Sequence, residues 1–328
     1  MVARGRQRLW KGFTMSKSDA KTKVPYWREL ESNGRKKREG KYGIDLGERG
    51  IYDKRNKLNE LTGKEWIYFT NSVWITAFPP VAGKDSGFDL RKIHPSPKPP
   101  ELIKEIVCFF TKSNQWILDP FAGVGGTLIG ASLCEPARNA VGIELNKDYV
   151  NAYKKVNSNL KLKKQEMICS DARNISRHKK IKERIFDLIL TDPPYSDMMA
   201  RNKNGQKKKL YGKNDASKFT FDDRDIGNLN RKDFLEELKS IISLALKYLK
   251  DKGYLVIFCK DFQPTDDSPN LLHNDVINKL IEIPCLRYRG LRIWHDQAMD
   301  LYPFGYPYAF VMNQLHQYIL IFRKELLT

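Results

Sequence analysis

The sequence predicts a doubly wound α/β domain whose core is a mostly parallel, seven-stranded sheet. From about residue 100 onward, short apolar runs alternate with segments that repeat hydrophobic residues at helical spacing. The apolar runs lack the polar alternation of a half-exposed strand, which is typical of strands that are covered on both faces. A chain of 328 residues, 41% of them hydrophobic, suffices for one such domain with a sizeable core.

Each expected strand is a short, mostly apolar run bounded by turn signals or charged residues. Residues 186–190 read FDLIL and residues 253–258 read GYLVIF, and both runs have the length of a strand rather than of a helix. The seven strands expected on this basis are residues 116–118, 140–143, 166–169, 186–190, 253–258, 291–294 and 318–322.

Each expected helix has a start signal or a hydrophobic period near 3.6 residues. Residues 102–111 follow the pair Pro99-Pro100, and residues 127–134 follow a glycine turn. Residues 231–249 repeat apolar side chains three and four positions apart. The helices expected in this way are residues 102–111, 127–134, 147–160, 231–249 and 271–281.

Composition excludes several classes of protein. The longest apolar stretches fall well short of the ~20 residues that a membrane helix needs, so we expect no membrane partner. Five scattered cysteines without a CxxC pair predict a reducing, cytoplasmic setting, and five histidines without ligand spacing predict no metal site. The formal charge of +19 indicates a polyanion, above all nucleic acid, as the partner.

The basic charge is concentrated in two segments. Residues 1–57 hold 17 Lys or Arg against 7 Asp or Glu and show no hydrophobic period, so we expect this part to lack regular structure until it is bound. We therefore divide the chain into a basic N-terminal extension, residues 1–65, which is partly disordered or contacts DNA, and a catalytic domain, residues 66–328. The catalytic domain is expected to carry insertions at residues 198–230 and 261–313.

The second basic segment lies within the first insertion. Between Arg201 and Lys218 there are seven Lys or Arg against Asp215 alone, with hardly any apolar anchor. We expect a loop whose cations contact nucleic-acid phosphates. The residues assigned to this contact are Arg201, Lys203, Lys207, Lys208, Lys209 and Lys213.

A glycine-rich turn follows the first expected strand. The run Asp119-Pro120-Phe121 leads into Gly123 and Gly125, directly before a helix. Glycine leaves room for a ligand to lie against the backbone, and it tolerates positive φ. The spacing does not match the dinucleotide pattern GxGxxG, so a nicotinamide cofactor is disfavoured.

Two further strand ends carry acidic residues. Glu144 follows the second strand, 21 positions after Gly123, where α/β nucleotide folds hold ribose hydroxyls. Asp171, with Ala172 after it, follows the third strand and is placed to accept from an adenine amino group. Either acid alone could be a strand-end capping residue. Together with the glycine turn they predict a nucleoside-containing cofactor.

The most specific motif is Asp192-Pro193-Pro194-Tyr195, which follows the fourth strand. The two prolines stiffen the loop and fix the direction of the Pro193 carbonyl. A carboxylate and a carbonyl are both acceptors, and an aromatic ring follows at once. This arrangement suits the exocyclic amino group of a planar base, with the ring stacked on the base.

With these motifs in place, the sequence resembles the amino-methylating DNA methyltransferases that make N6-methyladenine or N4-methylcytosine. The resemblance covers about residues 66–324 and implies a Rossmann-like class I methyltransferase fold with S-adenosylmethionine as cofactor. It implies cofactor contacts for Asp119, Pro120, Phe121, Gly123, Gly125, Glu144, Asp171 and Ala172, and a catalytic role for residues 192–195. It also implies that the segment HPSPKP covers the methionine end of the cofactor, with His94 and Lys98 as contacts.

The resemblance makes double-stranded DNA the expected substrate and a companion restriction endonuclease a further expected partner. Adenine N6 is favoured over cytosine N4, because the tetrapeptide begins with Asp and the cytosine enzymes tend to carry Ser there. An RNA guanine-N2 methyltransferase and a non-catalytic nucleic-acid-binding protein of the same fold remain alternatives. We expect the target DNA sequence to be recognised by the first 90 residues, by residues 198–230 or by residues 261–313.

Overall fold

A computed structural model describes residues 40–76, 87–195, 220, 222–297 and 299–326, and the chain separates into two units. The smaller unit comprises Met1–Arg55 and Thr62–Ile67, and the larger unit comprises Asn56–Leu61 and Tyr68–Thr328. No helix within the described ranges is long and apolar enough to cross a membrane.

The described part of the smaller unit is a short hairpin with a helical turn, together with the start of helix α3 (Gly63–Phe69). Strands β1 (Gly43–Asp45) and β2 (Ile51–Asp53) pair in antiparallel register, joined by the 3₁₀ helix η1 (Gly47–Arg49). Side chains hold this unit together: Thr62 Oγ1 donates to the Arg49 carbonyl at 2.6 Å, and Arg49 pairs with Glu65 at 2.7 Å. Regular structure therefore begins before residue 57. The sequence did not indicate this, because three-residue strands are too short to show a hydrophobic period.

The larger unit is built on an eight-stranded sheet, in the order β3-β9-β10-β8-β7-β4-β5-β6. Strand β10 is antiparallel to both of its neighbours, and the other pairings are parallel. The strands are β3 (Val73–Thr76), β4 (Trp116–Asp119), β5 (Asn139–Glu144), β6 (Glu166–Cys169), β7 (Phe186–Thr191), β8 (Leu249–Cys259), β9 (Leu286–Asp296) and β10 (His316–Lys324).

The eighth strand, β3, is the one that the sequence did not predict. It pairs in parallel with β9 at the edge of the sheet, and Trp294 Nε1 donates to Thr76 Oγ1 at 2.9 Å. Only Trp74 in it is buried, whereas Ile75 is 58% exposed. A four-residue edge strand with one buried side chain has no apolar run to reveal it.

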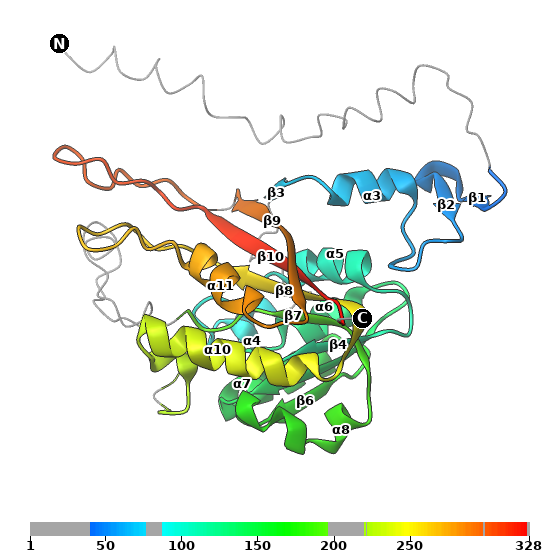
Figure 1. The fold of residues 1–328 in the computed structure, drawn as a ribbon, viewed down its shortest axis with the longest axis horizontal. Coiled ribbons are helices and arrows are strands. Elements are labelled where there is room, and N and C mark those ends of the chain that lie inside the picture. Colours follow the sequence, from blue (N-terminus) through cyan, green and yellow to red (C-terminus); the bar gives the residue numbers. More distant parts are fainter. Residues whose placement is uncertain (1–39, 77–86, 196–219, 221, 298, 327–328) are drawn as a thin grey trace, which may run out of the picture. The chain divides into compact units, whose positions relative to one another are not determined.

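Helices cover both faces of the sheet, which makes the unit doubly wound. Helices α5 (Pro100–Phe110), α6 (Gly126–Leu133) and α7 (Lys147–Asn159) pack on one face, and α10 (Arg231–Leu246) and α11 (Leu272–Ile281) on the other (Figure 1). Alternate residues of β8 serve the two layers: Leu255 and Ile257 face α10 and α11, while Val256 and Phe258 join the opposite cluster. Because both faces of the sheet are covered, the strands appear in the sequence as near-continuous apolar runs.

Shorter elements lie between the long ones: α4 (Phe88–Arg91), η3 (Ala172–Arg177), α8 (Lys179–Lys182) and η5 (Ile226–Asn228). Helix α10 ends at Leu246, three residues before the expected end, because β8 already begins at Leu249.

Strands β4, β5, β6, β7, β8 and β9 all run in one direction, so their carboxyl ends lie along one edge of the sheet. Asp119, Glu144 and Asp296 are the last residues of β4, β5 and β9, and Asp192 directly follows β7. The topology therefore gathers Asp119, Glu144 and Asp192, which were predicted at separate strand ends, at one edge of the sheet, together with Asp296, which was not predicted.

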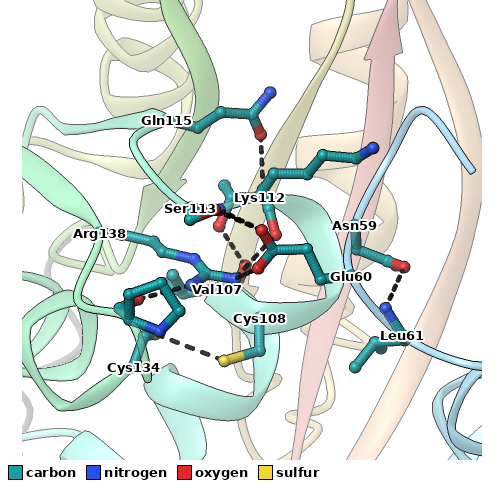
Figure 2. Close-up of polar contacts among 12 residues, drawn as sticks. Asn59, Glu60, Leu61, Val107, Cys108, Lys112, Ser113, Gln115, Cys134 and Arg138 are labelled. Carbon is teal, nitrogen blue, oxygen red and sulfur yellow. Dashed lines mark hydrogen bonds and ion pairs between the residues drawn. The ribbon is translucent and has the colours of Figure 1, made fainter. Parts of the chain in front are cut away.

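The opposite, amino edge carries a polar cluster of a different kind. Glu60 pairs with Arg138 at 2.8 Å and accepts from the Ser113 backbone N–H at 3.1 Å (Figure 2). Asn59 Nδ2 donates to the Phe109 carbonyl at 2.6 Å. Burial alone would raise the pKa of Glu60, but bonds from Ser113 and the charge of Arg138 lower it. These contacts fasten residues 56–61 to the loops that precede β4 and β5.

Candidate active site

A cavity of about 370 Å³ opens at the carboxyl edge of the larger unit. It brings together residues from the ends of β4, β5, β6 and β7 with the segment before α5. Most of the residues predicted for cofactor and catalysis line it: His94, Lys98, Pro120, Phe121, Gly123, Glu144, Asp171, Ala172, Asp192, Pro193, Pro194 and Tyr195.

The two glycines of the turn have different roles. Gly123 lines the cavity at φ 52°, and a Cβ there would lie 3.3 Å from Nε2 of His94. Gly125, at φ 77°, lines no described cavity, and a Cβ there would meet the ring of Tyr153 at 2.3 Å. Gly123 is thus the glycine that faces ligand space, whereas packing against α7 requires Gly125.

Asp119 lies beneath the turn rather than in the main cavity. It is 3% exposed, accepts from Thr191 Oγ1 at 2.7 Å and from the Phe121 N–H at 3.0 Å, and lines a small adjoining cavity of about 40 Å³. Burial raises its pKa to about 6 although these hydrogen bonds oppose the shift. Asp119 therefore ties the end of β4 to the end of β7 and fixes the shape of the turn.

Glu144 bridges the glycine turn and the start of α7. Its Oε2 accepts from the Gly123 N–H at 2.8 Å and its Oε1 from the Asn146 N–H at 2.7 Å. Burial raises its pKa to about 7, although both hydrogen bonds favour the charged form. A donor arriving from a ligand, such as a ribose hydroxyl, would favour the carboxylate further.

Asp171 is a capping residue as well as a cavity residue. Its carboxylate accepts from the Arg173 N–H at 2.8 Å at the start of η3, and pairs with the Arg173 guanidinium at 2.9 Å. Asp171 is thus a capping residue, as one interpretation of a strand-end acid predicted. Its position in the cavity also allows it to contact a ligand.

His94 and Lys98 lie close together but point to different partners. The His94 ring packs on Tyr149 with centroids 5.0 Å apart, and burial with the nearby cations Lys98 and Arg91 lowers its pKa to about 3. His94 is therefore neutral at physiological pH and would not repel a cationic ligand. Lys98 Nζ instead forms an ion pair of 2.5 Å with Asp192 Oδ2.

This ion pair holds the tetrapeptide Asp192–Tyr195 in place. The side chain of Lys98 is 7% exposed and that of Asp192 23% exposed. The Tyr195 hydroxyl donates to the other oxygen, Oδ1 of Asp192, and burial raises the pKa of Tyr195 well above its usual value, so it stays a neutral donor. Each carboxylate oxygen can accept more than one hydrogen bond, so both retain capacity for a substrate amino group.

The cavity also contains polar and aromatic residues that the sequence analysis did not assign. Arg224 and Asp225 lie within the first expected insertion, residues 198–230, and Lys260 follows β8. None belongs to a motif, and only the position after an expected strand could have indicated Lys260. The unassigned polar or large residues are Ser96, Tyr149, Ser170, Thr220, Arg224, Asp225, Lys260, Trp294, Asp296, Met299 and Gln317.

The residues predicted to contact phosphates, Arg201, Lys203, Lys207, Lys208, Lys209 and Lys213, lie outside the described residues. Within the described ranges, no group of three or more His, Cys, Asp or Glu side chains could hold a metal ion.

Family comparison agrees with the geometry of this site. The family model described as DNA methylase, of the N6 and N4 type, matches residues 13–155 and 186–326, which is most of the chain. The protein belongs to this family. Its Rossmann-like domain has the class I methyltransferase arrangement, with one antiparallel strand inserted between the parallel ones.

Two curated relatives share part of the sequence. The Type II methyltransferase M1.MboII of Moraxella bovis is 33% identical over 94 residues, 27% of this chain and 35% of that protein. The Type II methyltransferase M2.LlaDCHI of Lactococcus lactis subsp. cremoris is 39% identical over 62 residues, 19% of this chain and 22% of that protein. The chain thus matches about a third or less of the length of these relatives.

Solved structures with a related fold are distant. TrmN from Thermus thermophilus has a TM-score of 0.41 at 15% identity, covering 69% of this chain and 48% of its own. NSun6 from Pyrococcus horikoshii, solved with SFG, has a TM-score of 0.42 at 17% identity, covering 69% of this chain and 50% of its own.

Proposed function

We propose that this protein transfers the methyl group of S-adenosylmethionine to the exocyclic amino group of a base in double-stranded DNA. The observation that carries the proposal is one shared cavity, in which the acceptor tetrapeptide Asp192–Tyr195 lies beside Gly123 and Glu144. Membership of the DNA methylase family supports the same reaction.

The residues present fit S-adenosylmethionine. Gly123 leaves open the space that a Cβ would fill beside His94, and Glu144 offers a carboxylate to ribose hydroxyls. The neutral His94 and the acids Asp119 and Glu144 suit a cationic sulfonium better than cationic side chains would. When bound, the cofactor supplies an electrophilic methyl group.

Asp192 and the Pro193 carbonyl would accept the two protons of the base amino group. These bonds favour a pyramidal nitrogen, whose lone pair is then free for in-line attack, and they stabilise the positive charge that develops on it. The base must leave the duplex to reach this cavity, at an unstacking cost of a few kcal/mol that contact with Tyr195 helps to offset.

We infer that adenine N6 is the target, because the tetrapeptide begins with Asp192 rather than Ser. Cytosine N4 is the second candidate for the same geometry. We further infer a cytoplasmic enzyme whose basic residues 201–213 contact phosphates, and which acts beside a companion restriction endonuclease, as the Type II names of its relatives suggest.

Transfer of radiolabel from S-adenosylmethionine to unmethylated duplex DNA, compared with transfer to tRNA, tests the proposal. We expect label in DNA only, and mass analysis of the digested product should identify N6-methyladenine. Label in tRNA alone would favour the RNA guanine alternative, and no label in either would favour a non-catalytic binding protein.

A further inference from the structure

A second feature projects from the same edge of the sheet as the active site. The chain between β9 and β10 forms an extended loop, residues 300–315, which we call the aromatic arm (Figure 1). Asp296 and Met299 before the arm, and Gln317 after it, line the active-site cavity. The arm therefore starts and ends at the margin of the cavity.

The arm is held by hydrogen bonds of its own. Asn313 exchanges two bonds with the backbone of Tyr302, of 3.0 and 2.7 Å, which close the base of the arm. At the tip, the N–H groups of Tyr308 and Ala309 donate to the Gly305 carbonyl at 2.7 and 2.8 Å, and Gly305 adopts φ 75°. The tip is a defined turn that presents particular side chains.

Hydrogen bonds also brace the returning half of the arm against the segment that follows β8. Gln314 Nε2 donates to the Phe262 carbonyl at 2.9 Å, and Gln263 Nε2 donates to the Met312 carbonyl. Phe262 is buried, so this support belongs to the core of the larger unit. The direction of the arm is thereby fixed relative to the cavity.

The side chains presented at the tip are aromatic and exposed. Tyr308 is 93% exposed and Phe310 is 89% exposed, and Tyr306 beside them is 74% exposed. No residue from 301 to 315 carries a charge. Large apolar groups held in water are unfavourable by about 25 cal/mol per Å², so an ordered turn that displays them indicates a binding surface.

The position of the arm favours DNA bases as the occupant. A duplex that delivers a base to the cavity must run along this edge, so a protein docked on the arm would compete with the substrate. An uncharged aromatic tip does not suit phosphates but suits base faces. Extruding one base also leaves a gap in the stack, which a projecting ring can fill.

We propose that Tyr308 and Phe310 of the aromatic arm stack on DNA bases next to the extruded one. The inference rests on the proposed function, since it requires DNA as the substrate. It adds a contact that acts through stacking, in contrast to the phosphate contacts expected of the basic residues 201–213.

The test compares full-length wild type with the double variant Tyr308→Ala/Phe310→Ala. The probe is a fluorescently labelled, mixed-sequence DNA duplex, titrated at several salt concentrations with S-adenosylhomocysteine present. We expect at least a tenfold loss of affinity, the scale of lost base stacking, with an unchanged slope of log affinity against log salt because no phosphate contact is removed. The aromatic swap Tyr308→Phe/Phe310→Tyr should bind nearly as wild type does.

Ile185→Ala is the matched control. Ile185 is an exposed apolar residue, 63% accessible, directly before β7 and so at the opposite edge of the sheet. It should leave DNA affinity unchanged. All variants should keep wild-type affinity for S-adenosylhomocysteine, which shows that the larger unit is folded.

The inference would be overturned if the double alanine variant kept wild-type DNA affinity, or if its slope of log affinity against log salt were flatter than that of wild type. It would also be overturned if the double alanine variant sedimented differently from wild type in the absence of DNA, because the arm would then join copies of the chain. Methyl transfer by wild type keeps the two proposals apart. An active wild type beside an unaffected double variant contradicts the arm alone, whereas an inactive wild type contradicts the proposed function.

Discussion

The two edges of the sheet each hold a buried cation paired with a partly exposed acid, and the two pairs resemble each other closely. Arg138 and Glu60 lie 2.8 Å apart at the amino edge, with side chains 3% and 37% exposed. Lys98 and Asp192 lie 2.5 Å apart at the carboxyl edge, with side chains 7% and 23% exposed. Distance and burial alone do not distinguish a structural pair from a functional one.

The surroundings do distinguish them. Glu60 also accepts from the Ser113 backbone N–H, so the pair belongs to a network of protein groups (Figure 2). Asp192 has Tyr195 as its other partner and lines a cavity of about 370 Å³. We infer that the amino-edge pair stabilises the fold, whereas the carboxyl-edge pair prepares an acceptor for substrate.

The largest effect is expected at Asp192. Asp192→Ala should lower the rate of methyl transfer by about 10²- to 10³-fold, the scale for removing one polar group that stabilises developing charge. Cofactor affinity should change little, because the lost interaction is strongest in the transition state. Single-turnover kinetics and calorimetry measure the two quantities, and a wild-type rate would contradict the mechanism.

Lys98 separates two roles that the sequence could not separate. Its observed partner is Asp192, so Lys98→Met should lower turnover about 10- to 100-fold while cofactor affinity stays within about twofold. Lys98→Arg should restore much of the rate.

The opposite outcome is equally informative. If Lys98→Met weakens cofactor binding and leaves turnover at saturation unchanged, the contact implied by the family resemblance is the correct one. The ion pair with Asp192 would then be incidental to catalysis.

Glu60 is the counterpart at the amino edge. Glu60→Gln should lower the free energy of unfolding by about 1 to 3 kcal/mol, because the buried Arg138 loses its charged partner. Turnover per folded molecule should not change. The folded-state pKa of Glu60 is lowered, so its contribution is present at neutral pH and is lost as the pH falls through that pKa. Urea unfolding at pH 7 and pH 4 measures both effects, and equal stability of variant and wild type would contradict the assignment.

The smallest effect concerns Glu144, a half-buried acid without a cation in direct contact among the described residues. Its pKa is about 7 without ligand, and ribose donors would favour the charged form, so cofactor affinity should rise with pH and level off above about 7. The rise should not exceed about tenfold per pH unit for one proton. Calorimetry across this pH range on wild type and on Glu144→Gln measures the rise in cofactor affinity. Protonation of the cofactor itself affects both proteins equally, so a difference between them comes from Glu144. A rise that persists in the variant would exclude Glu144 as its cause.

The sequence predicted the parts of the molecule that depend on local pattern. The seven apolar strands and the residues at their carboxyl ends were identified, because burial on both faces and strand-end motifs leave traces in neighbouring residues. Strand β3 was missed because one buried residue, Trp74, makes no pattern. The Lys98–Asp192 pair joins residues 94 positions apart, so only the folded sheet brings them together. The same holds for Asp225 and Trp294 in the cavity wall.

The glycine turn was correctly located and both of its glycines have the expected positive φ, but Gly125 packs against a side chain instead of leaving room for a ligand. The ring of Tyr153 occupies the space where a side chain at position 125 would begin, and the backbone there has φ 77°. Among relatives we therefore expect residue 125 to depart from glycine only where position 153 carries a small side chain, so that the glycine turn and helix α7 would vary together.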